Sequence, residues 1–316
     1  MSADASLTND EVESLRAEHY NARVLSVRPV HGDLAILRVV PNEGFPGYQP
    51  GQYTTLGLGD WEPRCDGLAP KAGAQGKLIR RAYSISCSLV DSDGTPTTCA
   101  RSPWLEFYIA LVERPSDDPP MLTPRLFALQ EGDRVHVVHR PRGTYTLDSV
   151  ELGDDVILLS TGTGEAPHNT MIAELLARGH AGRIFNCVCV RLKKDLGYLD
   201  AHRSLEKHFA EYSYFPLTTR EPENLDASHP DYVGKQYLQE FFASGAFDEA
   251  IVGTVDPNRA HAFLCGNPAM IGIPRRDEEG EFHFPAPAGM IEVLVDRGFK
   301  LDRPRSPGNI HFEKYW

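Results

Sequence analysis

The first half of the chain alternates apolar and polar residues in short runs, a pattern typical of half-buried β-strands. The predicted strands span residues 22–30, 34–40, 53–58, 82–88, 104–112 and 134–138. Turn residues such as Gly32-Asp33 separate them, and one short helix is predicted near residues 124–129. Residues 1–18 form a polar start with one helical turn after Asn9 or Asp10. Several short strands joined by turns predict an antiparallel barrel.

The pattern changes after Leu152, where residues 156–160 form a continuous apolar run that is typical of a strand buried on both faces. Further strands are predicted at 184–190, 212–218 and 262–265, and helices at 169–178, 199–211, 237–243 and 290–297. Strands that alternate with helices indicate a parallel sheet with crossover connections. The chain therefore divides into an N-terminal extension at 1–18, a barrel domain at 19–152 and an α/β domain at 153–316.

Composition narrows the class of protein. The chain has 316 residues, 41% of them hydrophobic, which is enough for two globular domains. No apolar run reaches the length of a membrane-spanning helix, and the first ten residues do not look like a secretory signal. The net charge of −12 argues against non-specific binding to nucleic acid or membranes.

The six cysteines form no metal-binding, iron–sulfur or disulfide framework, because there is no Cys-x-x-Cys pair among them. We therefore expect no bound metal and a reduced, cytoplasmic chain.

Arg81-Ala82-Tyr83-Ser84 lies in a predicted strand, so Arg81 and Tyr83 share one side and Ser84 lies on the other. Such a strand offers a cation, a flat ring and a hydroxyl near a bound ligand. The alternative is an ordinary strand whose tyrosine packs in the core. Downstream, Leu122-Thr123-Pro124-Arg125 is typical of a helix start, with Thr123 as the cap and free N–H groups that attract phosphate. A capped helix without a ligand is the alternative there.

Thr161-Gly162-Thr163-Gly164 follows a buried strand and precedes a helix, which is the context of a dinucleotide-binding turn. Glycines let the main chain approach a ligand closely, and the helix start favours negative charge. The turn lacks the Gly-x-Gly-x-x-Gly pattern, so a standard dehydrogenase fold is disfavoured. Glu165 follows it and would place an acid beside the ligand.

Two cations directly follow strands in the second half, Arg191 and, beside Thr219, Arg220, and Lys235 lies further along the chain after Gly234. Ligands bind at the carboxyl ends of strands in open α/β sheets, and paired cations suit a phosphate group. Each cation alone could equally be a surface residue at a strand end. Cys265-Gly266-Asn267-Pro268 ends another strand, and Cys265 could also be a buried packing residue.

The sequence ends in Tyr315-Trp316, two aromatic residues that need a flat partner or a place in the core. The four segments at 81–84, 161–167, 265–270 and 315–316, in this order, resemble the ferredoxin–NADP reductase family, in particular the bacterial type with a C-terminal Tyr-Trp. The resemblance covers about residues 20–316. It implies an FAD-binding β-barrel domain followed by an NADP-binding α/β domain.

The resemblance also implies a role for each matching residue. Tyr83 would face the flavin ring, Arg81 would bind the FAD pyrophosphate together with Thr123, and Ser84 would lie near flavin N5. Cys265 would border the site of hydride transfer, Tyr315 would cover the isoalloxazine, and Trp316 would meet the adenine. The remaining cofactor-binding positions are Thr161, Gly162, Thr163, Gly164, Arg191, Thr219, Arg220, Lys235 and Asn267.

The implied activity is FAD-dependent electron exchange between NADPH and a separate one-electron carrier, ferredoxin or flavodoxin. The same flavoprotein could instead be the reductase component of an oxygenase, or an electron-transfer subunit of a larger complex. Because these carriers are acidic, docking would need a local basic surface. Two candidate stretches are Arg64, Lys71, Lys77, Arg80 and Arg81, and Arg297, Lys300, Arg303 and Arg305. Scattered solvated charges are the alternative interpretation of both stretches.

Overall fold

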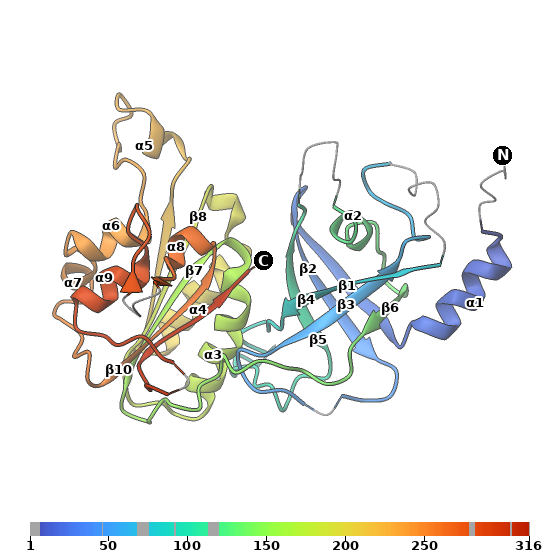
Figure 1. The fold of residues 1–316 in the computed structure, drawn as a ribbon, viewed down its shortest axis with the longest axis horizontal. Helices are drawn as coiled ribbons and strands as arrows, with labels where there is room; N and C mark the ends of the chain where they lie inside the picture. Colours follow the sequence, from blue (N-terminus) through green and yellow to red (C-terminus); the bar gives the residue numbers. More distant parts are fainter. Residues whose placement is uncertain are drawn as a thin grey trace. The chain divides into compact units, whose positions relative to one another are not determined.

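The computed structural model describes residues 7–45, 47–67, 76–91, 93–112, 120–277, 282–303 and 305–315. Figure 1 shows the chain, which forms two compact units. The first unit comprises Met1–Cys87 and Thr98–Thr144, and the second comprises Ser88–Thr97 and Tyr145–Trp316.

The first unit is built on one antiparallel sheet of six strands in the order β4-β3-β6-β1-β2-β5. The strands are β1 (Ala22–His31), β2 (Leu34–Pro41), β3 (Tyr53–Gly59), β4 (Leu78–Ser84), β5 (Leu105–Ala110) and β6 (Arg134–Val137). The N–H of Ser86, just after β4, donates to the carbonyl of Glu106 in β5 at 2.8 Å, so the two edge strands of the sheet meet. The sheet curls around a core that includes Leu56, Phe107 and Val135, and the predicted antiparallel barrel is confirmed.

Two elements of this unit differ from their predicted bounds. Helix α1 (Asn9–His19) has 11 residues rather than one turn. The N–H of Glu11 donates to Thr8 Oγ1 at 3.3 Å while the Glu11 carboxylate accepts from the Thr8 N–H at 2.8 Å, which caps the helix start. Strand β4 ends at Ser84 rather than at residue 88, because the chain beyond it turns to pair with β5.

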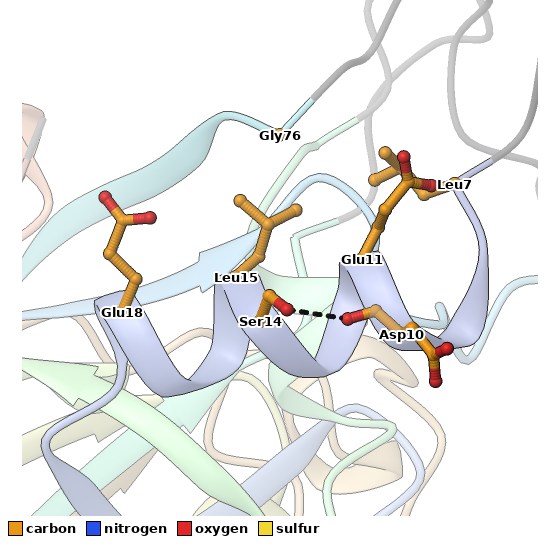
Figure 2. Close-up of a pocket in the computed structure, with 7 residues that line it drawn as sticks. All are labelled: Leu7, Asp10, Glu11, Ser14, Leu15, Glu18 and Gly76. Carbon is orange, nitrogen blue, oxygen red and sulfur yellow. Dashed lines mark hydrogen bonds between the residues drawn. The ribbon is translucent and has the colours of Figure 1, made fainter.

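Figure 2 shows a hollow along α1. It is lined by Leu7, Asp10, Glu11, Ser14, Leu15, Glu18 and Gly76. None of these residues belongs to the segments that the sequence associates with function.

The second unit is built on a five-stranded parallel sheet in the order β13-β10-β7-β8-β9. Its strands are β7 (Asp155–Thr161), β8 (Ile184–Val190), β9 (Tyr212–Thr218), β10 (Ala260–Gly266) and β13 (Ile310–Lys314). Strands β8 and β9 have the predicted bounds. Strand β13 pairs with β10, so the end of the sequence forms an edge strand of this sheet.

Helices connect these strands, and a small hairpin lies between α8 and α9. The elements are the 3-10 helices η1 (Gly162–Gly164) and η2 (Lys193–Asp195), the helices α2 (Thr123–Leu126, in the first unit), α3 (Glu165–Ala177), α4 (Leu199–His208), α5 (Pro222–Leu225), α6 (Leu238–Ala243), α7 (Ala246–Ala250), α8 (Pro268–Ile271) and α9 (Met290–Asp296), and the hairpin strands β11 (Arg275–Arg276) and β12 (Phe282–His283). The alternation of strands and helices confirms the predicted α/β parallel-sheet fold. Helix α3 begins four residues before its predicted start, directly after Gly164.

The two faces of the parallel sheet have different interiors. Ile157, Leu159 and Leu264 face an apolar cluster that they share with helices α6, α7 and α9 (Figure 1). Because side chains alternate along a strand, Ser160 and Asn186 lie on the opposite face, where α3 and α4 pack. That second face carries buried polar groups. In the part of the chain that the structure describes, no helix is long and apolar enough to cross a membrane.

Candidate functional site

Two glycine turns meet at the carboxyl ends of strands β7 and β10. The N–H of Asn267 donates to Thr161 Oγ1 at 2.8 Å, which ties the turns together. A Cβ added to Gly164 would lie 2.3 Å from the carbonyl oxygen of Cys265, and one added to Gly266, whose φ is +127°, would lie 2.3 Å from Thr161 Oγ1. Both positions therefore require glycine.

Gly162 has a different environment. Its φ is +53°, and a Cβ added there would meet no atom within 4 Å. The main chain at this position consequently faces open space at the start of η1 and α3. A glycine turn with open space at Gly162, at a helix start, fits the close approach of a phosphate-bearing ligand, as the sequence predicts.

Tyr315 lies across both turns. Its hydroxyl donates to the carbonyl of Thr163 at 3.1 Å, and its N–H donates to the carbonyl of Gly266 at 3.2 Å. The Cys265 side chain is fully buried nearby, and burial raises the pKa of its thiol well above the ordinary value. Cys265 is therefore suited to packing beside a ligand and not to nucleophilic attack. Trp316 lies outside the described residues.

A cationic edge, comprising Arg191, Arg220 and Lys235, lies at the carboxyl ends of β8 and β9. The carbonyl of Arg191 accepts from the N–H groups of Thr219 at 3.3 Å and Arg220 at 2.8 Å, which brings the two strand ends together. The N–H of Gln236, next to Lys235, donates to the carbonyl of Thr218 at 3.1 Å. The three predicted phosphate-binding cations thus lie on neighbouring segments.

The charges of this edge are available to a ligand. Arg191, Arg220 and Lys235 are all exposed. Among the residues that the structure describes, none of the three forms an ion pair, although acids are close by in sequence. Glu223 pairs instead with Lys193, at 2.6 Å, and Glu221 accepts from the Lys193 N–H. An exposed, unpaired set of cations suits a dianionic phosphate.

The Arg81-Ala82-Tyr83-Ser84 segment ends strand β4 of the first unit. Arg81 is exposed, Ser84 is buried, and Tyr83 lies between these extremes. The ring of Tyr83 packs edge-to-face against Phe107, with centroids 6.4 Å apart, and burial raises the pKa of its hydroxyl. Tyr83 thus contacts the barrel core, while Arg81 keeps a guanidinium that can bind an anion.

Thr123 does not cap a helix as the sequence predicts. Helix α2 begins at Thr123 itself, and the residue before it, Leu122, offers no side-chain cap. The Thr123 hydroxyl accepts instead from the N–H of Val112 at 3.3 Å. Arg125 holds this short helix in place, because its buried guanidinium donates to the carbonyls of Met121 and Asp60.

Glu165 also differs from expectation, since its carboxylate does not enter the open space near Gly162. Its side chain is 1% exposed and contacts His202 and Tyr214 on the face of the sheet covered by α3 and α4. Sequence reasoning missed these partners. The signal that could have pointed to them is the pair of tyrosines at alternating positions 212 and 214, which share one face of the strand.

Comparisons with known proteins agree with this geometry. Residues 158–276 match the family model described as an oxidoreductase NAD-binding domain. The ferredoxin–NADP reductase of Pseudomonas aeruginosa is 28% identical over 263 residues, covering 80% of this chain and 86% of the relative. That of Azotobacter vinelandii is 26% identical over 302 residues, covering 92% and 95%.

A solved structure shares the whole fold. The ferredoxin–NADP+ reductase of Neisseria gonorrhoeae, solved with bound FAD and NADP, superposes with a TM-score of 0.68 at 20% identity, covering 94% of this chain and 98% of the other. Residues 158–276 are therefore similar to an oxidoreductase NAD-binding domain, the chain shares the fold of the Neisseria gonorrhoeae structure, and curated relatives named ferredoxin–NADP reductase match most of its length.

Proposed function

We propose that this protein is an FAD-dependent oxidoreductase that exchanges electrons between NADPH and a one-electron carrier protein. The observation that carries the proposal is an open glycine turn at Gly162 together with three exposed cations at the ends of β8 and β9, which pair with no acid in the described part of the chain. Relatives that cover most of the chain carry the name ferredoxin–NADP reductase, which supports the same activity. We assign the FAD-binding domain to residues 19–152 and the NADP-binding domain to residues 153–316.

In the NADP half, this chain's own residues would bind and orient the dinucleotide. Arg191, Arg220 and Lys235 would bind the 2′-phosphate, with the two arginines able to offer paired donors and Lys235 a point charge. The main chain of Thr161–Gly164 would approach the rest of the dinucleotide, because no side chain stands in the way at Gly162. Cys265 and Asn267 would border the nicotinamide at the neighbouring turn.

In the flavin half, Arg81 would neutralise the FAD pyrophosphate with help from Thr123, Tyr83 would face the ring, and Ser84 would lie near N5. Bound FAD would supply the exchange between two-electron and one-electron chemistry. The exposed Arg81 and the partly exposed Tyr83 fit these roles. Tyr315 and Trp316 complete the proposal as the residues that cover the flavin ring and meet the adenine.

The partner we propose is ferredoxin or flavodoxin in the cytoplasm, as a separate protein. Cations are available on both units for such docking, for example the exposed Arg80 and Lys300. Lys71, in the first of the two predicted basic stretches, lies outside the described residues.

The test is to purify the protein without partners and to measure both its bound flavin and its NADPH-driven reductase activity. The protein should be yellow and should release FAD on heating or acidification, because no covalent attachment site is evident. It should also reduce an artificial one-electron acceptor such as ferricyanide, with NADPH as the electron donor.

Colourless protein, or flavin with no NADPH-driven reduction, would contradict the proposal. Flavin that stays with the precipitated protein would contradict noncovalent binding, and release of FMN would contradict the adenine contact of Trp316.

A further inference from the structure

Glu165, the first residue of α3, is a buried carboxylate directly behind the glycine turn. Its Oε1 lies 2.9 Å from His202 Nε2 of α4 and accepts from the hydroxyl of Tyr214 in β9 at 3.3 Å. Glu165 and His202 are 1% and 0% exposed. The contact to His202 is close but poorly directed for a hydrogen bond, so the attraction is mainly electrostatic. Burying these groups away from water is costly unless they hold each other.

The partners of His202 fix the orientation of its ring. The Asn186 amide donates to the Tyr212 hydroxyl at 3.2 Å, and that hydroxyl lies 2.7 Å from His202 Nδ1. Burial raises the pKa of Tyr212 well above its ordinary value, so its oxygen keeps its hydrogen. A Tyr212 hydroxyl that donates to Nδ1 leaves the ring hydrogen on Nε2, which is the nitrogen 2.9 Å from Glu165.

Two tyrosines of β9 pack nearly parallel to the same ring. The His202 ring stacks on Tyr214 with centroids 4.3 Å apart at 22°, and on Tyr212 at 6.1 Å and 26°. Rotation of His202 away from Glu165 would break both stacks and the bond to Tyr212. The arrangement consequently has one favoured geometry, as expected of a fully buried polar network.

The ends of this network lie beside the two parts of the proposed dinucleotide site. Glu165 follows Gly164 of the glycine turn. His202 lies in the first turn of α4, the helix that follows the loop after Arg191. Tyr214 lies in β9, whose carboxyl end leads to Thr219 and Arg220. The network thus ties the start of α3 to the two elements that flank the cationic edge.

We propose that Glu165 and His202 are positioning residues that fix the distance between the glycine turn and the cationic edge, so that both parts bind one dinucleotide at once. This inference rests on the proposed function. A ligand that spans two rigidly placed subsites gains from both contacts without a further ordering cost. A ligand that occupies only the cationic edge gains nothing from the spacing. Loss of the network should therefore weaken the whole dinucleotide more than its adenosine half.

The experiment compares the dissociation constants of NADP+ and 2′-phospho-AMP by calorimetric titration of the FAD-loaded protein. In Glu165→Ala and in His202→Ala, we expect NADP+ binding to weaken about tenfold or more, while 2′-phospho-AMP binding changes by less than about threefold. Glu165→Gln and Tyr214→Phe are milder variants that keep the shape of the site. They should shift the ratio of the two constants in the same direction by a smaller factor.

Two controls separate positioning from general loss of stability. Leu175→Ala destabilises the same helix α3 from a fully buried position that has no part in the network, and it should leave the ratio unchanged. The quadruple variant Glu165→Leu/His202→Leu/Tyr212→Phe/Tyr214→Phe replaces the whole polar cluster by apolar groups, so it should be more stable to heat than either single alanine variant. We expect it to retain the altered ratio.

Each failure has its own signature. If the unaltered protein binds neither ligand, the proposed NADP site is wrong. If it binds both, but the Glu165 and His202 variants weaken both ligands equally, or match Leu175→Ala, then the positioning role is wrong while the proposed function stands. Recovery of the original ratio in the quadruple variant would likewise overturn the inference, because packing alone would then set the spacing.

Discussion

The three cations of the cationic edge are unusual in a chain whose net charge is −12. Arg191, Arg220 and Lys235 are exposed, and within the described ranges no acid pairs with them. A folded protein gains nothing in stability from unpaired neighbouring cations of like sign. Their joint position at the ends of β8 and β9 is consistent with selection for an anionic ligand.

Replacement of Arg191 by Ala should raise the KM for NADPH about tenfold or more and leave that for NADH nearly unchanged. The reason is the loss of a charge-assisted contact worth roughly 1.5–3 kcal/mol to the 2′-phosphate, which NADH lacks. Steady-state rates with both cofactors measure the effect. The matched control is Arg178→Ala, which removes an exposed arginine at the far end of α3. Equal losses for both cofactors in the Arg191 variant would show that Arg191 supports the fold instead.

His168 should make the protein sensitive to mild acid. It is fully buried, its Nε2 lies 2.8 Å from the Tyr145 hydroxyl, and burial lowers its pKa from 6.5 to about 3. Between these values the unfolded chain binds a proton that the folded chain does not, so stability falls as pH falls through this window. The contribution of His168 is a loss of about 1.5 kcal/mol between pH 6.5 and pH 5.

Denaturant unfolding at several pH values checks this contribution. His168→Leu should be less stable at neutral pH, because Tyr145 loses its partner, but its stability should fall less steeply between pH 6.5 and pH 5. The comparison isolates His168 from His180, His261 and His311, whose pKa values are also lowered by burial. Parallel curves for the two proteins would count against the buried neutral histidine.

At this scale the sequence predicts which residues gather but not how their side chains bond. Arg191 and Arg220 are placed together as expected, since both follow adjacent parallel strands. Thr123 lies at a helix start as predicted, but its hydroxyl does not cap the helix. It accepts instead from the N–H of Val112, which belongs to another segment. The sequence places Glu165 beside the ligand because it directly follows the glycine turn. Its actual partners, His202 and Tyr214, are 37 and 49 positions away, so no local pattern indicates them.

Among the elements, continuous apolar runs were the most predictable. Strand β8 has the expected bounds because it lies inside the sheet with all of its residues buried, whereas β9 has them as an edge strand that pairs with β8 along its whole length. Helix α1 is longer than the predicted single turn. The Thr8–Glu11 cap and the ion pair between Arg16 and Glu62 of the barrel stabilise its 11 residues. The ion pair is a tertiary contact with no periodic signature in sequence, whereas the cap from Thr8 to Glu11 is a local signal that could have been read from the sequence.

Strand β13 leads into the tyrosine that crosses the glycine turns, so this element should control access to the nicotinamide subsite. In the proposed site, a nicotinamide beside Cys265 would have to displace Tyr315, which bonds to Thr163 and Gly266. Tyr315→Ser should therefore tighten binding of oxidised NADP+ and reduce discrimination against NADH. Titration with oxidised cofactor, followed by absorbance for a charge-transfer band, measures the change.

The controls for this element separate the ring from the hydroxyl. Tyr315→Phe keeps the ring and removes only the bond to Thr163, so its effect should be smaller than that of Tyr315→Ser. Truncation after Lys314 removes both terminal aromatic residues and should also weaken FAD retention. If all three variants keep the original cofactor binding and NADPH preference, the terminal segment only packs against the sheet.

For the whole molecule, the six cysteines give a simple test of the fold. Cys65 is exposed and the other five are buried. A thiol reagent such as dithiobis(nitrobenzoate) should label one thiol per chain in the native state and six in denaturant. Burial raises the pKa of Cys65 too, so labelling should be faster at alkaline pH. Native Cys65→Ser should remain unlabelled, and rapid labelling of that variant would mean that a buried cysteine, such as Cys265, opens to solvent.

The unlike faces of the parallel sheet also bear on how this protein can change during evolution. On the face shared with α6, α7 and α9, exchanges such as Ile157→Val or Leu264→Met preserve contacts and cost less than about 1.5 kcal/mol. On the face covered by α3 and α4, replacing Asn186 or Tyr212 leaves the other residue without its hydrogen-bond partner. That loss should lower the free energy of unfolding by roughly 1–3 kcal/mol. Lineages descended from this sequence should therefore diverge freely on the first face and only by coordinated pairs of substitutions on the second.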